Sequence, residues 1–195
     1  RVGVNLAGID KSDLERGDVL AEPGTLVKTD LLAAQLKLLT TAPLVLESGT
    51  RIRLHLGARE VMARVYLLDR EELLPGEEGL VNFQLEEPVV ANFKQHYIIR
   101  RYSPMTTIGG GEILDPNPQK SRQDKNQLIT DLKTKAAGNW AEQIKLVLRR
   151  AADKPVSISK LVVKLSQPPK KLRAKLAELE AENQVVKLAA GQQST

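Results

Sequence analysis

The feature that most constrains this chain is a change of hydrophobic spacing at Asp115-Pro116-Asn117-Pro118. Before this point, apolar residues recur at every second position, which is typical of β-strands with one buried face. After it they recur every three or four positions, as in amphipathic helices. Two prolines within four residues mark a connector. The sequence therefore predicts a mixed protein of two modules, a β module followed by a mostly helical one.

The β module contains about seven short alternating runs. Ile52, Leu54 and Leu56 alternate with polar residues, and similar runs occupy residues 2–6, 32–38, 61–67, 81–85, 97–101 and 107–114. Strands of this number and spacing favour an antiparallel sheet closed into a barrel or sandwich, because closure hides the sheet edges. The run Gly109-Gly110-Gly111 lacks the following helix that a dinucleotide-binding fingerprint needs, so it indicates close backbone approach or a bulge.

The helical module follows the order of a winged helix. Helices are predicted over residues 122–137, 140–152 and 168–182, with a short helix capped by Ser157 between the last two. A strand at 184–188 and a hairpin turn beginning at Gly191 complete the order. The expected domains are 1–27, 28–116, 117–139 and 140–195. Since the chain begins with Arg1 in a strand-like run, we expect it to be a piece of a longer protein.

Composition excludes several classes of chemistry. There is no cysteine, so disulfides, thiolate metal sites and cysteine nucleophiles are excluded. No Gly-x4-Gly-Lys-Ser/Thr loop occurs, and the two histidines are too few for a histidine metal site. The sequence has no run of 18 apolar residues, so no transmembrane helix is predicted. We therefore expect no catalytic, cofactor or metal site in this chain.

The net charge of +5 is unevenly distributed. Residues 1–118 carry 13 Lys and Arg against 17 Asp and Glu, whereas residues 119–195 carry 16 against 7. Residues 154–175 contain no acidic residue, and this stretch is either a polyanion-binding face or a solvated surface. Basic residues at the start of a helix oppose its dipole, which suggests a role other than stability. The candidates for RNA binding here are Lys164, Lys170, Lys171, Arg173 and Lys175.

A second candidate is the cluster Arg100-Arg101-Tyr102. Two guanidinium groups beside an aromatic ring suit phosphate contact together with stacking on a base or ribose. His96 lies close by in the sequence, where either a loop hydrogen bond or an RNA contact is consistent with its position. His55 alternates with arginines and is interpreted as a surface residue.

Three stretches resemble a known family. The segment containing ERGDVLA (residues 15–21) is similar to the end of domain II in translational GTPases of the EF-Tu type. LPGEEGLVNFQL (74–85) is similar to their domain III. YSPMTTIGGGEILDP (102–116) resembles SelB, the selenocysteine-specific branch of this family. The resemblance covers residues 1–116 most strongly, and the module order agrees with winged helices following domain III.

This resemblance implies a function. SelB-type factors bind GTP and selenocysteyl-tRNA in the cytoplasm and deliver the tRNA to a ribosome at a recoded UGA codon, while their winged helices bind a hairpin in the messenger RNA. GTP and Mg would belong to a GTPase domain outside this chain. The chain itself would supply an RNA-facing scaffold, with Arg100, Arg101 and Tyr102 in the region where the third domain of EF-Tu approaches the tRNA T stem.

Two other functions remain open from the residues alone. One is a DNA-binding winged-helix regulator whose β module serves as an effector or dimerisation domain. The other is a metabolic enzyme with an active site in the barrel, which a fully packed barrel interior would exclude.

Overall fold

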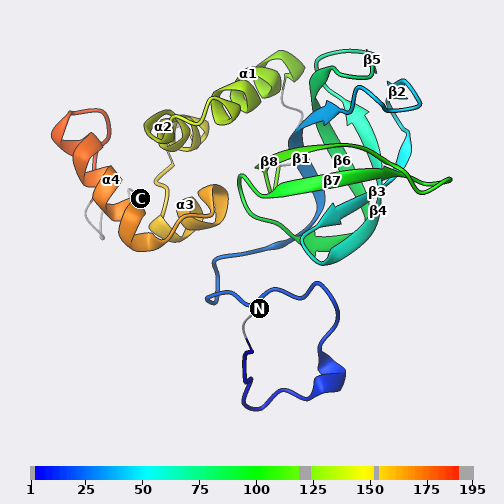
Figure 1. The fold of residues 1–195 in the computed structure, drawn as a ribbon. Coiled ribbons are helices and arrows are strands. Elements are labelled where there is room, and N and C mark those ends of the chain that lie inside the picture. Colours follow the sequence, from blue (N-terminus) through cyan, green and yellow to red (C-terminus); the bar gives the residue numbers. More distant parts are fainter. Residues whose placement is uncertain (1–2, 119–123, 152–153, 189–195) are drawn as a thin grey trace.

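The computed structural model describes residues 3–118, 124–151 and 154–188. Six antiparallel strands close into a barrel in the order β1-β6-β4-β3-β7-β8, and β8 pairs with β1 (Figure 1). The barrel strands are β1 (Lys28–Leu38), β3 (Arg51–Leu56), β4 (Arg59–Leu67), β6 (Glu78–Val90), β7 (His96–Arg101) and β8 (Thr107–Asp115). The short strands β2 (Leu46–Glu47) and β5 (Glu72–Leu73) pair with each other. This confirms the predicted antiparallel barrel.

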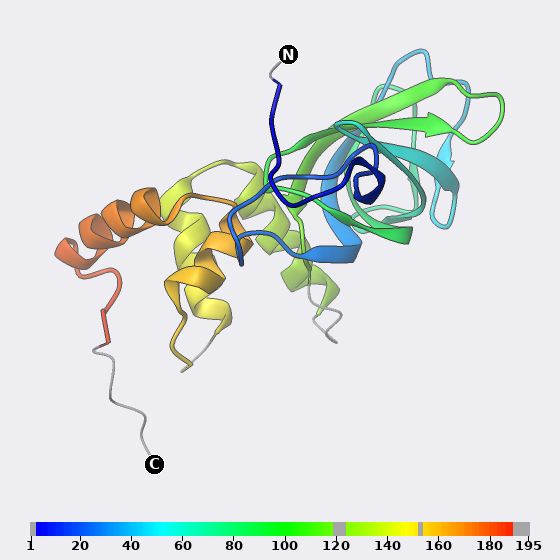
Figure 2. The ribbon, with the colours of Figure 1, turned by 90° about the horizontal axis from the view of Figure 1, so that it is seen from below.

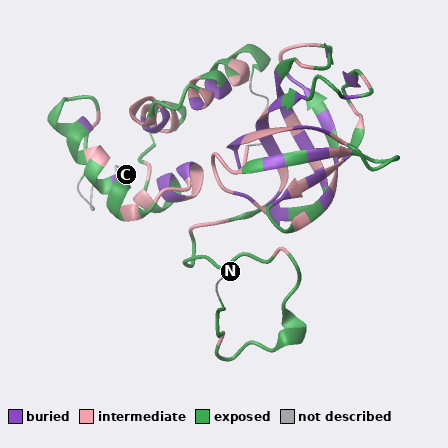
Figure 3. Ribbon diagram, in the orientation of Figure 1, coloured by how far each residue is buried: buried purple, intermediate pink, exposed green. Residues whose placement is uncertain are grey.

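Apolar side chains fill the barrel. Ile52, Leu54 and Leu56 of β3 are buried, and the same alternation runs along the other strands (Figure 3). Phe83 meets Tyr97 edge-on, with ring centroids 5.1 Å apart. Because burial of one such side chain contributes about 1.5–3 kcal/mol, the interior is the main source of stability of this module. A packed interior also excludes the proposal of an active site inside the barrel.

The closure of the barrel depends on the glycines of β8. A Cβ atom on Gly111 would lie 1.9 Å from the carbonyl oxygen of Gln35, and one on Gly110 would lie 2.5 Å from that of Tyr97. The Tyr97 hydroxyl donates a hydrogen bond of 2.8 Å to the same Gln35 carbonyl, and burial raises the pKa of this phenol. The glycine run therefore serves close backbone approach, as the sequence predicted.

The helices are α1 (Lys125–Ala136), α2 (Trp140–Arg150), α3 (Ile158–Leu165) and α4 (Pro169–Ala181). Helices α2 to α4 share one apolar core built around Ile144, Leu161 and Leu172, and Trp140 packs against it. Ser157 caps α3 as predicted, since its hydroxyl accepts a hydrogen bond from the Lys160 amide. Figures 1 and 2 both show these helices to one side of the barrel.

Helix α1 packs instead on the outer face of the barrel. Leu132 lies in a buried cluster with Ala33, Leu80 and Leu114, which point outward from β1, β6 and β8. Ala33 is fully buried even though its neighbours Leu32 and Ala34 face the interior. The outer wall of the barrel at β1 and β8 is thus the surface on which the helical part docks.

A buried carboxylate joins the barrel to two helices. Asp115, at the end of β8, lies 2.5 Å from the ammonium of Lys135 on α1 and 3.7 Å from that of Lys164 on α3. The Lys164 ammonium also donates to the carbonyl oxygen of Asn117. Burial alone would raise the pKa of Asp115, but the two lysines together lower it below its usual value. Asp115 and Lys135 are both more than nine-tenths buried, so neither charge is well hydrated.

Two further contacts fix the joint. The Lys94 ammonium lies 2.7 Å from Glu112 and donates to the Ala136 carbonyl at the end of α1. The Phe93 amide donates to the hydroxyl of Ser166, which follows α3. The connector at Pro116 and Pro118 therefore links two parts that also contact each other through charge and hydrogen bonds.

The structure corrects two strand predictions. Residues 3–6 form no strand, and residues 3–27 are irregular apart from a short 3-10 helix, η1 (Lys11–Asp13). Residues 184–188 form no strand either, and Val186 and Leu188 are largely exposed. A strand is stable only when a neighbour pairs with its backbone, and none does so within the described residues. The predicted turn at Gly191 lies outside the described residues.

We predict that Gly111→Ala destabilises the barrel. The new methyl group would overlap the Gln35 carbonyl oxygen that accepts from Tyr97, so we expect a loss of about 1–3 kcal/mol or more in the free energy of unfolding, measured with urea. Gly3→Ala is the matched control, because nothing lies within 4 Å of its added Cβ. Equal stability of the two variants would contradict this account of closure.

We also predict that Asp115→Asn costs about 3–5 kcal/mol near neutral pH, because it leaves Lys135 buried without its charge partner. The pKa of Asp115 is lowered in the folded state, so its contribution is present above the usual value of 3.8 and is lost as pH falls through the lower folded value. The difference between wild type and variant should therefore shrink in that acidic range, as measured by unfolding at each pH. Glu178→Gln, in an exposed pair with Lys175, should change stability little at any pH.

Candidate nucleic-acid interface

The alternation of β7 separates the residues of the predicted Arg100-Arg101-Tyr102 cluster. Tyr97 and Ile99 point into the barrel, which leaves Arg100 on the outer face. Arg101 has the opposite parity but is exposed because the strand ends there. Tyr102 follows in the connection to β8 and is 50% exposed. Only Arg100 and Tyr102 therefore lie against the outer surface of neighbouring strands.

The register of β3 brings further arginines to the same face. Arg53 of β3 lies opposite Arg100 of β7, and Arg51 lies opposite Arg64 of β4. Two guanidinium groups lie near the Tyr102 ring, with that of Arg51 5.0 Å and that of Arg53 5.4 Å from its centroid. We call this surface the arginine wall; it consists of Arg51, Arg53, Arg64, Arg100 and Tyr102.

Two carboxylates orient part of the wall. Glu86 receives two hydrogen bonds of 2.7 Å from Arg51, and Glu60 receives one of 2.5 Å from Arg53. These hydrogen bonds lower the pKa of each glutamate and raise that of Arg51. The groups are exposed, so the pairs add little stability, but they hold the guanidinium planes beside Tyr102.

Three arginines form no ion pair within the described residues, although Arg64 lies in the field of Glu86 and Arg100 in that of Glu60. Arg64 donates only to the Gly49 carbonyl and Arg100 only to the Thr107 hydroxyl, and neither forms an ion pair within the described residues. Arg101 is likewise without a carboxylate partner in that part of the chain. Guanidinium groups of this kind are available to phosphate oxygens, which they bind in a bidentate manner.

The structure does not bring His96 to the arginine wall. Its side chain is 83% exposed and its Nδ1 lies 3.9 Å from Glu112. His96 stands four residues from Arg100 on β7, a separation of about 13 Å along the strand. Any contact with RNA at His96 would therefore be separate from that at the wall.

The basic residues of the helical module divide into two groups. Lys164 is engaged by Asp115 and Asn117 in the joint, and burial lowers its pKa. Lys170, Lys171 and Arg173 are exposed on the first turns of α4, and Lys175 pairs with Glu178 at 2.6 Å. In Figure 1, α4 lies on the side of the helices away from the barrel, so this basic face is remote from the arginine wall.

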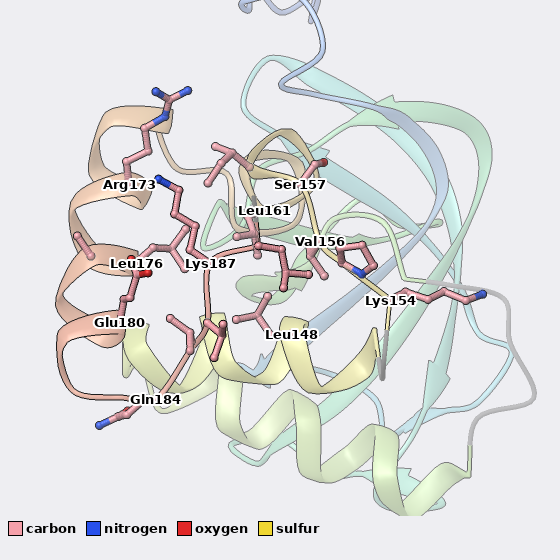
Figure 4. A pocket seen from close by; sticks show the side chains of 16 residues that line it. Leu148, Lys154, Val156, Ser157, Leu161, Arg173, Leu176, Glu180, Gln184 and Lys187 are labelled. Atoms are coloured by element: carbon pink, nitrogen blue, oxygen red, sulfur yellow. The ribbon is translucent and has the colours of Figure 1, made fainter. Parts of the chain in front are cut away.

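A groove opens next to α4. It encloses about 770 Å³, and Leu148, Leu161 and Leu176 line its floor, while Arg173, Lys154 and Gln184 extend outward at the rim (Figure 4). Its lining is more apolar than polar, so it differs in chemistry from the arginine wall.

No group of three or more His, Asp or Glu side chains in the described parts of the chain is arranged to hold a metal ion. No helix among the described residues has the length and hydrophobicity to cross a membrane.

Sequence reasoning identified Arg100, Arg101 and Tyr102 but missed Arg51, Arg53 and Arg64. The available signal was the alternation that puts these arginines on the polar face of their strands. The alternation did not reveal which strands are neighbours, and that information was needed to place β3 between β4 and β7.

The described residues thus combine a closed β-barrel, which has a basic outer wall, with a helical unit that follows it. Residues 33–120 match the family model described as the β-barrel domain of the selenocysteine-specific elongation factor. The chain belongs to the selenocysteine-specific elongation factor family.

Two curated relatives have the name selenocysteine-specific elongation factor. The protein from Desulfomicrobium baculatum is 32% identical over 161 residues, which cover 83% of this chain and 25% of that protein. The protein from Haemophilus influenzae is 25% identical over 154 residues, which cover 78% of this chain and 24% of that protein. The chain thus spans about a quarter of the length of these relatives.

Proposed function

We propose that the chain is the central part of a factor that delivers selenocysteyl-tRNA to the ribosome at recoded UGA codons. In this proposal the whole factor is a cytoplasmic GTPase, and GTP and Mg bind in a domain outside this chain. The barrel supplies a surface for the tRNA. Later winged helices of the factor bind the messenger RNA hairpin.

The arginine wall is the observation that carries this proposal. Double-stranded RNA is bound mainly through its phosphates, its 2′-hydroxyls and its shape, and not through its base edges. A row of outward-facing guanidinium groups around a half-exposed tyrosine suits such a backbone. Arg101, at the end of β7, extends this surface beyond the wall.

The joint at Asp115 supports a scaffold role. Buried ion pairs and a hydrogen bond hold α1 and α3 against the barrel. In this proposal the barrel and the helices therefore keep a fixed relative position when RNA binds. We propose that the basic residues of α4 make a second, sequence-independent contact with RNA. The residues concerned are the exposed Lys170, Lys171 and Arg173 and the half-buried Lys175, which must exchange its ion pair with Glu178 for the RNA. Lys164 is left out because the joint engages its charge.

The names of the relatives favour this function over a DNA-binding regulator. Both relatives align with most of this chain, including the barrel, which would be the effector domain in the regulator hypothesis.

We predict that Arg64→Ala combined with Arg101→Ala weakens binding of a selenocysteine tRNA transcript. Each lost phosphate contact reduces the dependence of log K on log[salt] by about 1, so the slope should fall by about 2 between roughly 50 and 200 mM KCl. Fluorescence anisotropy of labelled transcript measures both affinity and slope.

The matched control is Lys28→Ala combined with Lys37→Ala. It removes two exposed cations from β1, which lies across the barrel from β3. Equal losses of affinity and slope in the two double variants would show that the barrel attracts RNA by net charge alone, and the arginine wall would no longer be the tRNA surface.

A further inference from the structure

Two carboxylates stand among the four arginines of the arginine wall. Glu86 belongs to β6 and Glu60 to β4, and each forms an ion pair with an arginine of β3. The hydrogen bonds from these arginines lower the pKa of both glutamates, so both side chains are ionised at neutral pH. Two of the four positive charges of the wall are therefore compensated before any ligand arrives.

Glu86 occupies the hydrogen-bonding fork of Arg51. Its two oxygens accept from Nε and Nη2 of Arg51, each at 2.7 Å. This is the same parallel pair of donors that arginine presents to a phosphate, so a phosphate that binds Arg51 in this manner must first displace Glu86. Arg64 lies opposite Arg51 in the sheet, and its charge also acts on Glu86.

Glu60 has the corresponding position at Arg53. It accepts a hydrogen bond of 2.5 Å from Arg53, and the charge of Arg100 also acts on it. Glu60 further lines a polar hollow of about 460 Å³ at the margin of the wall, to which Arg16, His55 and Arg100 contribute. The carboxylate of Glu60 is therefore surrounded by cationic and polar groups of the barrel surface.

The two glutamates divide the arginines of the wall into two kinds. Arg51 and Arg53 each hold a carboxylate. Arg64 and Arg100 form no ion pair within the described residues and lie only in the field of the glutamates. A duplex whose phosphates reach the unpaired arginines gains charge-assisted contacts. A duplex whose phosphates fall at the paired arginines must displace the carboxylates and then lies beside them.

Stability does not account for the position of these carboxylates, because exposed ion pairs contribute little to folding. Like charges brought together at an interface oppose binding much more strongly. A binding site becomes specific when it opposes the wrong ligand as well as attracting the right one. The glutamates of the arginine wall are placed to do the former.

We propose that Glu60 and Glu86 are specificity-determining residues, which oppose RNA duplexes whose phosphates fall at the paired arginines and so restrict the arginine wall to a duplex whose backbone matches the unpaired ones. They act through their charge and not through their shape. The inference rests on the proposed function, since it concerns the same surface and the same class of ligand.

Two RNAs distinguish specific from general binding by the 195-residue chain. One is the selenocysteine tRNA transcript, and the other is a fully paired RNA hairpin of unrelated sequence with the same number of nucleotides. Fluorescence anisotropy over a range of KCl concentrations gives the affinity and the salt slope for each. The ratio of the two affinities measures specificity.

The double variant Glu60→Gln with Glu86→Gln releases Arg51 and Arg53 for phosphate. We expect it to bind the unrelated hairpin about tenfold more tightly, with a salt slope steeper by about 2. Binding of the tRNA should tighten less, because the tRNA already uses the unpaired arginines. The affinity ratio should therefore fall.

Two control variants separate charge from shape and from net charge. Glu60→Asp with Glu86→Asp keeps both negative charges, so it should bind the hairpin as weakly as wild type. Glu22→Gln with Glu71→Gln changes the net charge as much as the first double variant does, at exposed glutamates that form no ion pair in the described parts of the chain. It should leave the affinity ratio unchanged. Urea unfolding checks that every variant is folded.

An affinity ratio that stays at its wild-type value in the folded Gln variant of Glu60 and Glu86 would overturn the proposal. An equal fall in the control at Glu22 and Glu71 would also reject it, because net charge alone would then set the ratio. If the Asp variant behaves like the Gln variant, shape and not charge is responsible, and the proposal is again wrong.

The double variant of Arg64 and Arg101 tests the proposed function separately. If it weakens tRNA binding while the Gln variant of Glu60 and Glu86 keeps the wild-type ratio, only the present inference fails. If it leaves tRNA binding unchanged, the proposed function fails, and the role of the glutamates fails with it.

Discussion

The arrangement of this protein depends on one buried carboxylate. Asp115 ends the last barrel strand, and its carboxylate forms ion pairs with Lys135 of α1 and Lys164 of α3. One carboxylate therefore connects a strand and two helices. A charge in such a place is stable only with its partners present. The apolar contacts of Leu132 with the barrel hold α1 on the same wall, and together they fix where the helices lie.

The position of α1 on the barrel also explains why the arginine wall is exposed to solvent. Helix α1 covers the outer surface near β1 and β8, while β3, on the opposite side of the barrel, remains uncovered. The barrel interior accepts only apolar side chains, so the alternate positions of β3 and β7 must point to solvent. Closure and docking therefore leave the arginine wall at the surface of the barrel.

The departures from the sequence prediction share a physical cause. Residues 3–6 and 184–188 have strand-like alternation, but a strand needs a hydrogen-bonded neighbour, and alternation carries no information about one. In β1, alternation predicts that Ala33 is exposed on the outer face of the barrel. Ala33 is instead buried there by α1, which follows more than 90 residues later in the chain. Lys164 was a candidate for RNA contact from charge alone, and the fold places its ammonium beside Asp115 instead.

Local sequence determined the barrel strands, the helices, the Ser157 cap and the need for glycine in β8, because periodicity, capping and backbone crowding act over a few residues. It also indicated Arg100, Arg101 and Tyr102 as a basic aromatic cluster. Only the tertiary structure decided that Arg51 and Arg53 lie over Tyr102, that Arg16 and Arg100 line one hollow, and that Asp115 joins the modules. These contacts join residues at least 20 positions apart, and strand order and helix docking bring them together.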